Sequence, residues 1–155
     1  MPKKVLPMTI SIGAALFVGG LSAFLTKGSM PVYSALNLPA LAPPSWVFPI
    51  VWTVLFVMMG IAAALVWCSN GGAFDAALLF YAAQLIVNFF WTIIFFNFQA
   101  YFGAFIWLLF LIVLIIITAV LFYRKEKAAG WLFLPYFAWV CFAGYLNFGV
   151  WVLNR

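Results

Sequence analysis

The side chains of this sequence that could do chemistry are neutral amides and indoles. Amides donate and accept hydrogen bonds, and an indole adds a flat apolar face and one N–H donor. Spacings of four, three and four residues place one set on a single face of a helix: Gln84, Asn88, Trp91 and Phe95. A second set steps by four along a later segment: Pro135, Trp139, Ala143 and Asn147. Together these groups suit the binding of a flat, largely apolar ligand.

The two asparagines, Asn88 and Asn147, lie within apolar sequence. An amide buried in hydrocarbon without a partner costs a few kcal/mol, so both should face protein or a ligand. Two interpretations stay open, because the amides can bond neighbouring helices or contact a bound molecule. Tryptophans near the ends of apolar segments, such as Trp46, fit a membrane-interface belt. Deeper tryptophans are better candidates for a pocket: Trp52, Trp91 and Trp139.

Charged side chains are too scarce for most other kinds of chemistry. They make up 6% of the 155 residues, against about 25% in soluble domains, and the sequence has no histidine. The two acidic residues, Asp75 and Glu126, lie outside the apolar segments. This excludes carboxylate proton relays, Ser-His-Asp hydrolases and metal centres, and it argues against nucleic-acid binding. Cys68 and Cys141 are interpreted as small buried hydrophobes.

Long charge-free stretches define the elements that must position these groups. Residues 28–74, 76–123 and 128–154 carry no charge, and each exceeds the roughly 20 residues that cross a bilayer as a helix. With a mean hydropathy of +1.25, the chain is predicted to be an all-α membrane protein, a single domain over 1–155 with a bundle of five transmembrane helices. A β-barrel is excluded because runs such as 106–120 do not alternate. The predicted spans are 5–26, 46–68, 76–96, 102–123 and 130–152, and a proline-rich loop covers 27–45.

The first span and the charges at the span ends carry topology signals. Lys3 and Lys4 before an apolar run resemble a signal peptide, but the run is long, and its small residues at a spacing of four favour a permanent helix of the bundle. Five basic residues fall on the side of the N-terminus and two, Lys27 and Arg155, on the other. The positive-inside rule then predicts the N-terminus inside and loop 27–45 outside.

Three groups of motifs, in order along the chain, resemble those of a known family. They are Tyr33-x-x-Leu36-x-x-Pro39 with Pro43-Pro44-x-Trp46-Val47-Phe48-x-x-Val51-Trp52, then Tyr81-x-x-Gln84-Leu85-x-x-Asn88-x-x-Trp91, then Pro135-Tyr136-x-Ala138-Trp139-x-x-Phe142 with Leu146-Asn147 and Trp151. Over residues 33–151 their order and spacing resemble the TspO/MBR family, the tryptophan-rich sensory proteins and translocator proteins.

The resemblance implies a five-helix bundle, commonly a homodimer, and we expect it in a bacterial cell membrane. Members of the family bind porphyrins such as protoporphyrin IX and haem, relatives also bind sterols, and no cofactor is required. The implied function is a receptor or sensor for such apolar ligands, in a pocket beneath the first loop. By motif, the residues that line the pocket are Tyr33, Pro43, Pro44, Trp46, Trp52, Asn88, Trp91, Trp139, Ala143 and Asn147.

Three positions depart from the family pattern and bear on activity. Val32 and Leu41 stand where members often have tryptophan, and Trp107 stands where many have aspartate. Some bacterial relatives degrade protoporphyrin in light through reactive tryptophans; Trp139 would be that residue here, whereas Val32 cannot form an indole radical. Light- and oxygen-dependent porphyrin degradation is one alternative function, and passive transport of tetrapyrroles or sterols is another.

Overall fold

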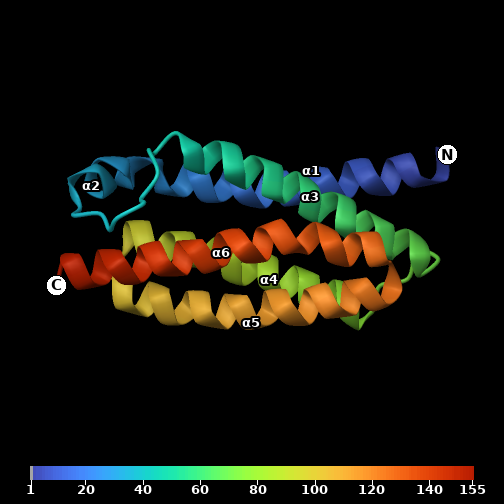
Figure 1. Ribbon diagram of the computed structural model, residues 1–155. Coiled ribbons are helices and arrows are strands. Elements are labelled where there is room, and N and C mark those ends of the chain that lie inside the picture. Colours follow the sequence, from blue (N-terminus) through green and yellow to red (C-terminus); the bar gives the residue numbers. More distant parts are fainter. Residues whose placement is uncertain (1) are drawn as a thin grey trace.

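The structure, a computed structural model, describes residues 2–155, and the described part contains helices and no strand. Each charge-free stretch forms long helices, because a helix satisfies its own backbone hydrogen bonds where no water is present. In chain order the elements are α1 (Pro2–Thr26), η1 (Lys27–Ser29), α2 (Met30–Ala35), α3 (Val47–Ser69), α4 (Ala76–Thr92), η2 (Ile93–Asn97), α5 (Tyr101–Lys125) and α6 (Lys127–Leu153). Figure 1 shows the long helices side by side in one bundle.

Five helical segments of the described chain are long and apolar enough to cross a membrane. The prediction of an all-α bundle with five spans is therefore confirmed. The predicted loop over 27–45 holds more helix than expected, since η1 and α2 continue the helical path as far as Ala35. Pro31 lies in the first turn of α2, where a missing N–H costs nothing. The extended part of the loop begins at Leu36.

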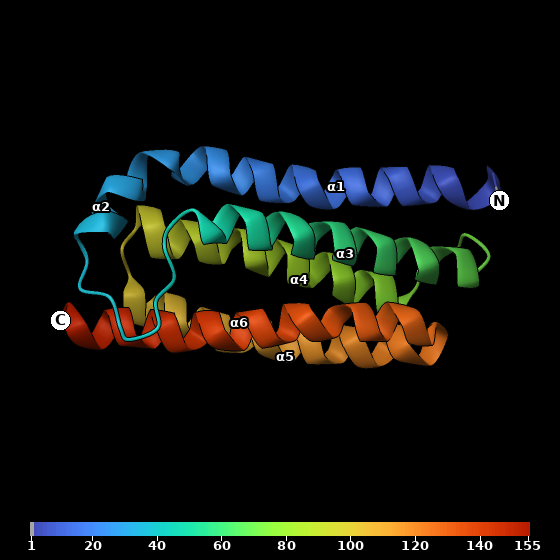
Figure 2. The ribbon, with the colours of Figure 1, turned by 45° about the horizontal axis from the view of Figure 1, so that its top comes forward.

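The order of the helices follows from short connections. A single residue, Glu126, separates α5 from α6, so these two helices pack as an antiparallel pair. α4 packs on α5, and α1 packs mainly on α3. Figures 1 and 2 place α2, the following loop and the C-terminus at one end of the bundle, and the N-terminus at the other. We call these the loop end and the N-terminal end.

Glycines allow α1 and α3 to approach closely. A Cβ atom added to Gly60 of α3 would lie 2.5 Å from the Cα of Ile12, and one added to Gly19 of α1 would lie 2.5 Å from the ring of Phe56. Small residues at a helix interface let backbones approach, which is how helices associate in lipid. The small residues predicted to make the first span a bundle member thus include a true interface position, Gly19.

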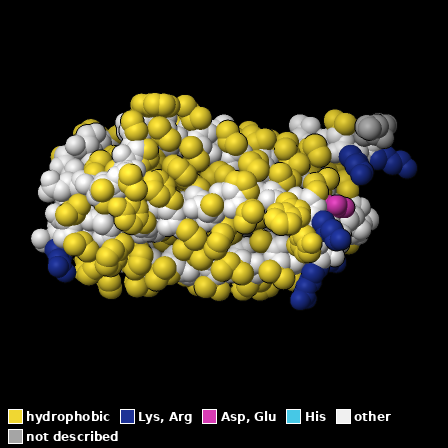
Figure 3. Space-filling model, in the orientation of Figure 1, with side chains coloured by type: hydrophobic (Ala, Val, Ile, Leu, Met, Phe, Trp, Pro, Cys, Tyr) yellow, Lys and Arg dark blue, Asp and Glu magenta, His cyan; other side chains and the backbone are white. Residues whose placement is uncertain are grey.

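The outer surface is apolar over the length of the bundle and charged at its ends. Figure 3 shows hydrophobic side chains across the middle of one face, with lysine and arginine at the two ends. The helix bounds place Arg124 and Lys125 at the N-terminal end, together with Lys3 and Lys4. Such a band of apolar surface between charged ends matches a bilayer.

One ion pair closes the bundle at the N-terminal end. Lys125 Nζ lies 2.9 Å from Asp75 Oδ2. Asp75 also caps α4, because its Oδ1 accepts a hydrogen bond from the N–H of Leu78 at 3.2 Å. The Lys125 ammonium holds the pKa of the Asp75 carboxyl below its usual value, and the Leu78 N–H adds to this effect.

Candidate functional site

The polar face of α4 points into the bundle and forms a hydrogen-bonded chain there. Asn88 Nδ2 donates to Tyr136 Oη at 2.8 Å, and Tyr136 Oη donates to Gln84 Oε1 at 2.7 Å. Gln84 Nε2 contacts the sulfur of Met59 at 3.6 Å. Gln84 and Tyr136 have no exposed surface, and Asn88 has 3%. The amide of Asn88 therefore bonds a neighbouring helix, one of the two interpretations that the sequence left open.

The second asparagine joins three helices nearer the loop end. Trp91 Nε1 of α4 donates to Asn147 Oδ1 of α6 at 3.1 Å, and Asn147 Nδ2 donates to the carbonyl of Tyr101, in the first turn of α5, at 2.8 Å. Asn147 is 1% exposed. Each polar atom of its side chain thus has a protein partner, so this amide fixes the positions of α4, α5 and α6 around the interior.

Aromatic rings fill the space between this polar chain and the loop. Trp52 of α3 lies 6.5 Å from Trp91 and 6.3 Å from Tyr136, measured between ring centroids. Nearer the loop, Phe48 lies 6.0 Å from Tyr33 and 5.9 Å from Trp139. We call the whole group the aromatic cluster: Tyr33, Phe48, Trp52, Trp91, Phe95, Phe96, Tyr136 and Trp139.

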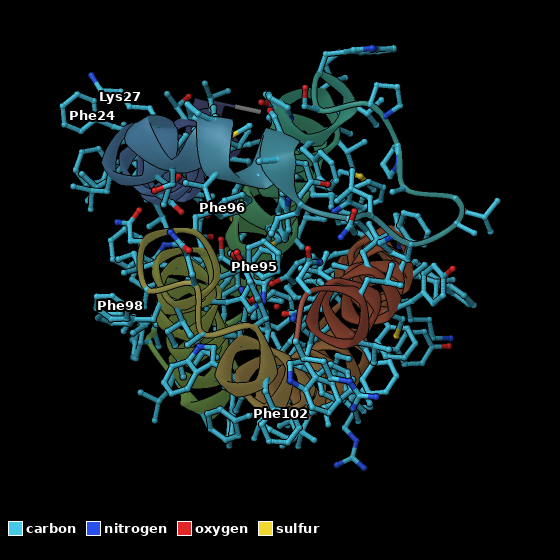
Figure 4. All side chains as sticks on the ribbon, turned by 90° about the vertical axis from the view of Figure 1, so that its left-hand side faces the viewer. Phe24, Lys27, Phe95, Phe96, Phe98 and Phe102 are labelled. Atoms are coloured by element: carbon cyan, nitrogen blue, oxygen red, sulfur yellow. The ribbon has the colours of Figure 1, made fainter. Side chains whose placement is uncertain are left out.

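The π-helical turn η2 joins the two parts of the aromatic cluster. Phe96 lies 5.8 Å from Tyr33 and 6.5 Å from Trp91, while Phe95 lies 5.6 Å from Trp91. Figure 4 views the bundle from the loop end and shows Phe95 and Phe96 toward the interior, with Phe98 at the periphery. π-helical turns recur at functional sites because they change which residues share a helix face.

The loop after α2 is fastened across the C-terminal half of α6. The side chain of Asn154 makes two hydrogen bonds with the backbone of Asn37, accepting from its N–H and donating to its carbonyl, each at 2.9 Å. Tyr145 Oη donates to the carbonyl of Ala40 at 2.8 Å. A Cβ added to Gly149 would lie 2.6 Å from the side chain of Pro39, so a larger residue here would displace the loop. Figure 2 shows the loop crossing α6.

The structure brings together most of the residues predicted to line a pocket. Tyr33, Trp52, Trp91 and Trp139 belong to the aromatic cluster, Asn88 and Asn147 bond its members, and Ala143 is buried on α6. The other three lie outside it. The side chain of Trp46 is 66% exposed at the start of α3, and Pro44 is exposed, while Pro43 is half-buried.

Among the described residues, one buried polar atom of the aromatic cluster has no partner. Trp139 Nε1 is buried, and among the described residues no acceptor lies within hydrogen-bonding distance of it. The indole N–H of Trp91, by contrast, is bonded to Asn147. Leaving a buried donor unpaired costs about 1–3 kcal/mol. An acceptor atom supplied by a ligand at the edge of the ring would remove that cost.

The rings of the aromatic cluster pack against one another, with Phe48, Trp52, Phe96 and Trp139 half-buried at its edge. Two cavities of about 540 and 650 Å³ are found elsewhere, and none of the ten predicted lining residues contributes to either. A flat ligand would enter the aromatic cluster by separating rings that now pack against one another.

Sequence reasoning missed several residues that build the site. Tyr136 was visible only as part of a motif, although it is the centre of the hydrogen-bonded chain, and Gln84 was placed on the polar helix face but not among the site residues. Trp107 donates its indole N–H to the carbonyl of Val87 at 2.7 Å and so connects α5 to α4. Leu41 lies at the tip of the loop with φ of 69° and 82% of its surface exposed.

The described residues hold no group of three or more histidine, cysteine, aspartate or glutamate side chains that could bind a metal ion. The chemistry on offer is stacking on indole and phenyl faces, hydrogen bonding to neutral groups, and burial of apolar surface. Such a site recognises shape and aromatic character.

Comparisons with known proteins agree across the chain. A sequence model of the TspO/MBR family matches residues 11–152. The chain is 38% identical to tryptophan-rich protein TspO of Chlorobaculum tepidum, with 99% of each chain covered. It is 36% identical to protein CrtK of Rhodobacter capsulatus, with 95% of each covered. It is also 34% identical to the human translocator protein, with 95% of this chain and 88% of the human protein covered.

Proposed function

The chain belongs to the TspO/MBR family and is an integral membrane protein that crosses the membrane several times. From that premise we propose that it is a receptor that binds porphyrins such as protoporphyrin IX and haem in the aromatic cluster. The macrocycle would stack against Trp52, Trp91 and Trp139. Sterols and similar flat apolar molecules fit the same description, because stacking and apolar burial do not depend on one particular ring system.

The observation that carries this proposal is the unpaired indole N–H of Trp139 inside a group of aromatic rings. A porphyrin presents a large apolar face together with carboxylate oxygens that accept hydrogen bonds. Stacking contributes about 0.5–1.5 kcal/mol per aromatic pair beyond burial, and a hydrogen bond about as much again. The fixed amides of Asn88 and Asn147 keep α4 and α6 in place around such a ligand.

The test is a titration of the purified protein with protoporphyrin IX in the dark, in which the quenching of tryptophan fluorescence measures binding. Trp139→Phe keeps an aromatic face but replaces the indole by a smaller phenyl ring and removes the N–H, so we expect a dissociation constant higher by about 3- to 10-fold. Trp131→Phe is the matched control, since Trp131 is on the same helix but 63% exposed at the other end. Equal affinities in the two variants would remove Trp139 from the site.

The same preparation separates the alternative functions. Porphyrin degradation predicts loss of the porphyrin absorbance band under light and oxygen, faster than with denatured protein and slower in Trp139→Phe. Passive transport, which the name translocator protein suggests for the human relative, predicts porphyrin flux into proteoliposomes above the flux into empty liposomes. A receptor predicts saturable binding with neither of these effects.

Two further expectations belong to the same proposal. We propose a homodimer, which cross-linking in the membrane would detect. We also propose that the N-terminus lies inside a bacterial cell membrane and loop 27–45 outside, as the distribution of basic residues indicates. Labelling of a cysteine introduced at the exposed Leu41 by a membrane-impermeant reagent would test this orientation.

A further inference from the structure

A cavity of about 540 Å³ lies at the N-terminal end, and none of its lining residues belongs to the aromatic cluster. We call it the wedge cavity. Its volume falls within the range of about 300–1,000 Å³ that is usual for small-molecule sites. It is lined mainly by apolar side chains, with the hydroxyl-bearing Ser11 and Tyr81 and no charged residue. Its walls come from α1, α3, α4 and the connection between α3 and α4: Leu6, Pro7 and Ile10 of α1, Ala64 and Trp67 of α3, Phe74, and Ala82 of α4.

The wedge cavity exists because two helices diverge beside small side chains. α1 and α3 touch at Ile12 and Gly60, where there is no room for a Cβ. From that contact toward the N-terminus the two helices move apart in both Figure 1 and Figure 2. The residues of α3 and α4 that face the gap include Ala63, Ala64 and Ala82, which are too short to fill it.

The wedge cavity opens to the lipid side of the bundle. Leu6 and Ile10, which form its α1 wall, are 66% and 61% exposed. An unfilled apolar hollow loses dispersion contacts on its walls. Lipids are the most abundant apolar molecules in a membrane, so the expected occupant of the wedge cavity is a lipid acyl chain.

Unpaired positive charge lies next to the α1 wall. Lys3 and Lys4 precede Leu6 by less than one helical turn, and both are exposed. Within the described chain the one ion pair is that between Lys125 and Asp75, so neither Lys3 nor Lys4 has an acidic partner. Figure 3 shows several basic side chains at this end beside a single acidic one. Trp67, at the end of α3, marks the membrane interface at this level.

We propose that the wedge cavity binds one acyl chain of an anionic phospholipid whose phosphate is held by Lys3 and Lys4. The apolar walls accept the chain, and the two ammonium groups select a negatively charged headgroup. This site is separate from the aromatic cluster and does not depend on the porphyrin proposal.

The test of the headgroup is native mass spectrometry of the full chain released from detergent containing phosphatidylglycerol or phosphatidylcholine. At low salt we expect one retained phosphatidylglycerol and a preference over phosphatidylcholine of up to about 25-fold, given the attraction of two lysines to an anionic lipid. Lys3→Gln with Lys4→Gln should abolish the preference. Lys27→Gln with Arg155→Gln removes two charges at the other end and should leave it unchanged. Equal retention of the two lipids by the native chain would overturn the proposal.

The test of the cavity is Ala82→Phe, which places a ring in the gap that this half-buried alanine leaves. We expect retention of phosphatidylglycerol to fall at least about tenfold. Ile86→Phe adds a ring on the same helix at a position 58% exposed to lipid, and it should retain phosphatidylglycerol as the native chain does. Ser11→Phe fills the gap from α1 and serves if Ala82→Phe fails to fold. Retention that is unchanged in a folded variant with the cavity filled would overturn the proposal.

Discussion

Replacing Tyr136 by phenylalanine removes one oxygen atom from the centre of the bundle. That oxygen accepts a hydrogen bond from Asn88 and donates one to Gln84, and the tyrosine side chain has no exposed surface. Tyr136→Phe keeps the ring and its packing against Trp52 and Phe133. The change therefore isolates the hydrogen bonds, because it leaves an amide N–H and an amide carbonyl without a partner.

The expected loss of stability follows from the two bonds. Hydrogen bonds between membrane helices contribute about 0.6 kcal/mol on average and at most about 1.7 kcal/mol. Groups left unpaired in a water-free interior cost about 1–3 kcal/mol each. Neither Asn88 nor Gln84 can reach water, since their exposed surfaces are 3% and 0%. The two lost bonds together account for about 1–3 kcal/mol, and the two groups left unpaired extend the upper limit to about 6 kcal/mol. We therefore expect Tyr136→Phe to lower the free energy of unfolding by at least about 1 kcal/mol.

The assay is reversible unfolding in mixed micelles of mild detergent and dodecyl sulfate, followed by tryptophan fluorescence. Tyr145→Phe is the matched control on the same helix. It removes one hydrogen bond to the carbonyl of Ala40 at the exposed surface, so we expect a loss below about 1 kcal/mol. If Tyr136→Phe destabilised the protein no more than Tyr145→Phe, the hydrogen-bonded chain would not hold α4 and α6 together.

Three further predictions concern the helix contact, the loop and the ion pair. Gly60→Ala forces a Cβ against the backbone of α1 and should cost about 1–3 kcal/mol of unfolding free energy in the same assay, whereas Gly20→Ala, which meets nothing within 4 Å, should cost nothing. Asn154→Ala removes both bonds to the loop and should speed proteolysis of the loop and porphyrin association several-fold. Lys125 holds the pKa of Asp75 below its usual value of 3.8, so the ion pair stabilises the fold above that pH. The contribution is below about 1 kcal/mol because the pair is exposed, and it is lost as pH falls through the lowered pKa. Asp75→Asn should remove this pH dependence.

Each of these predictions has an outcome that would contradict it. Equal stability of Gly60→Ala and Gly20→Ala would mean that α1 does not pack against Gly60. Cleavage of the loop at the native rate in Asn154→Ala would mean that other contacts hold the loop. If the unfolding free energies of the native chain and of Asp75→Asn depended on pH in the same way between about 2 and 5, the ion pair would not contribute to stability.

The five spans could be predicted because hydrocarbon allows few structures. Because a helix of about 20 apolar residues pairs all its backbone hydrogen-bonding groups within itself, the apolar stretches 76–96 and 102–123 could be predicted as transmembrane helices. The inward orientation of Asn88 and Asn147 followed from the same argument, since an amide cannot face lipid without cost. These predictions needed no knowledge of which helices are neighbours.

The partners of the polar groups could not be predicted in the same way. Whether Asn88 bonds Tyr136 or a ligand depends on how far α4 and α6 are shifted along the bundle axis relative to each other, and helix–helix packing sets this shift. The fastening of the loop by Asn154 joins residues 117 positions apart, at the end of a helix where nothing in the local sequence marks it. Trp46 fits two interpretations from its sequence position, a pocket and an interfacial belt, and its 66% exposure accords with the second.

The most direct measurement of the central claim is the indole N–H spectrum of the protein labelled with nitrogen-15 tryptophan, before and after protoporphyrin IX is added in the dark. The chain has eight tryptophans, and Trp139→Phe and Trp131→Phe assign the two signals that matter. We predict that the signal of Trp139 shifts as its unpaired N–H gains an acceptor, while that of Trp131 stays in place. An unchanged Trp139 signal at saturating porphyrin would contradict the proposal that the aromatic cluster is the binding site.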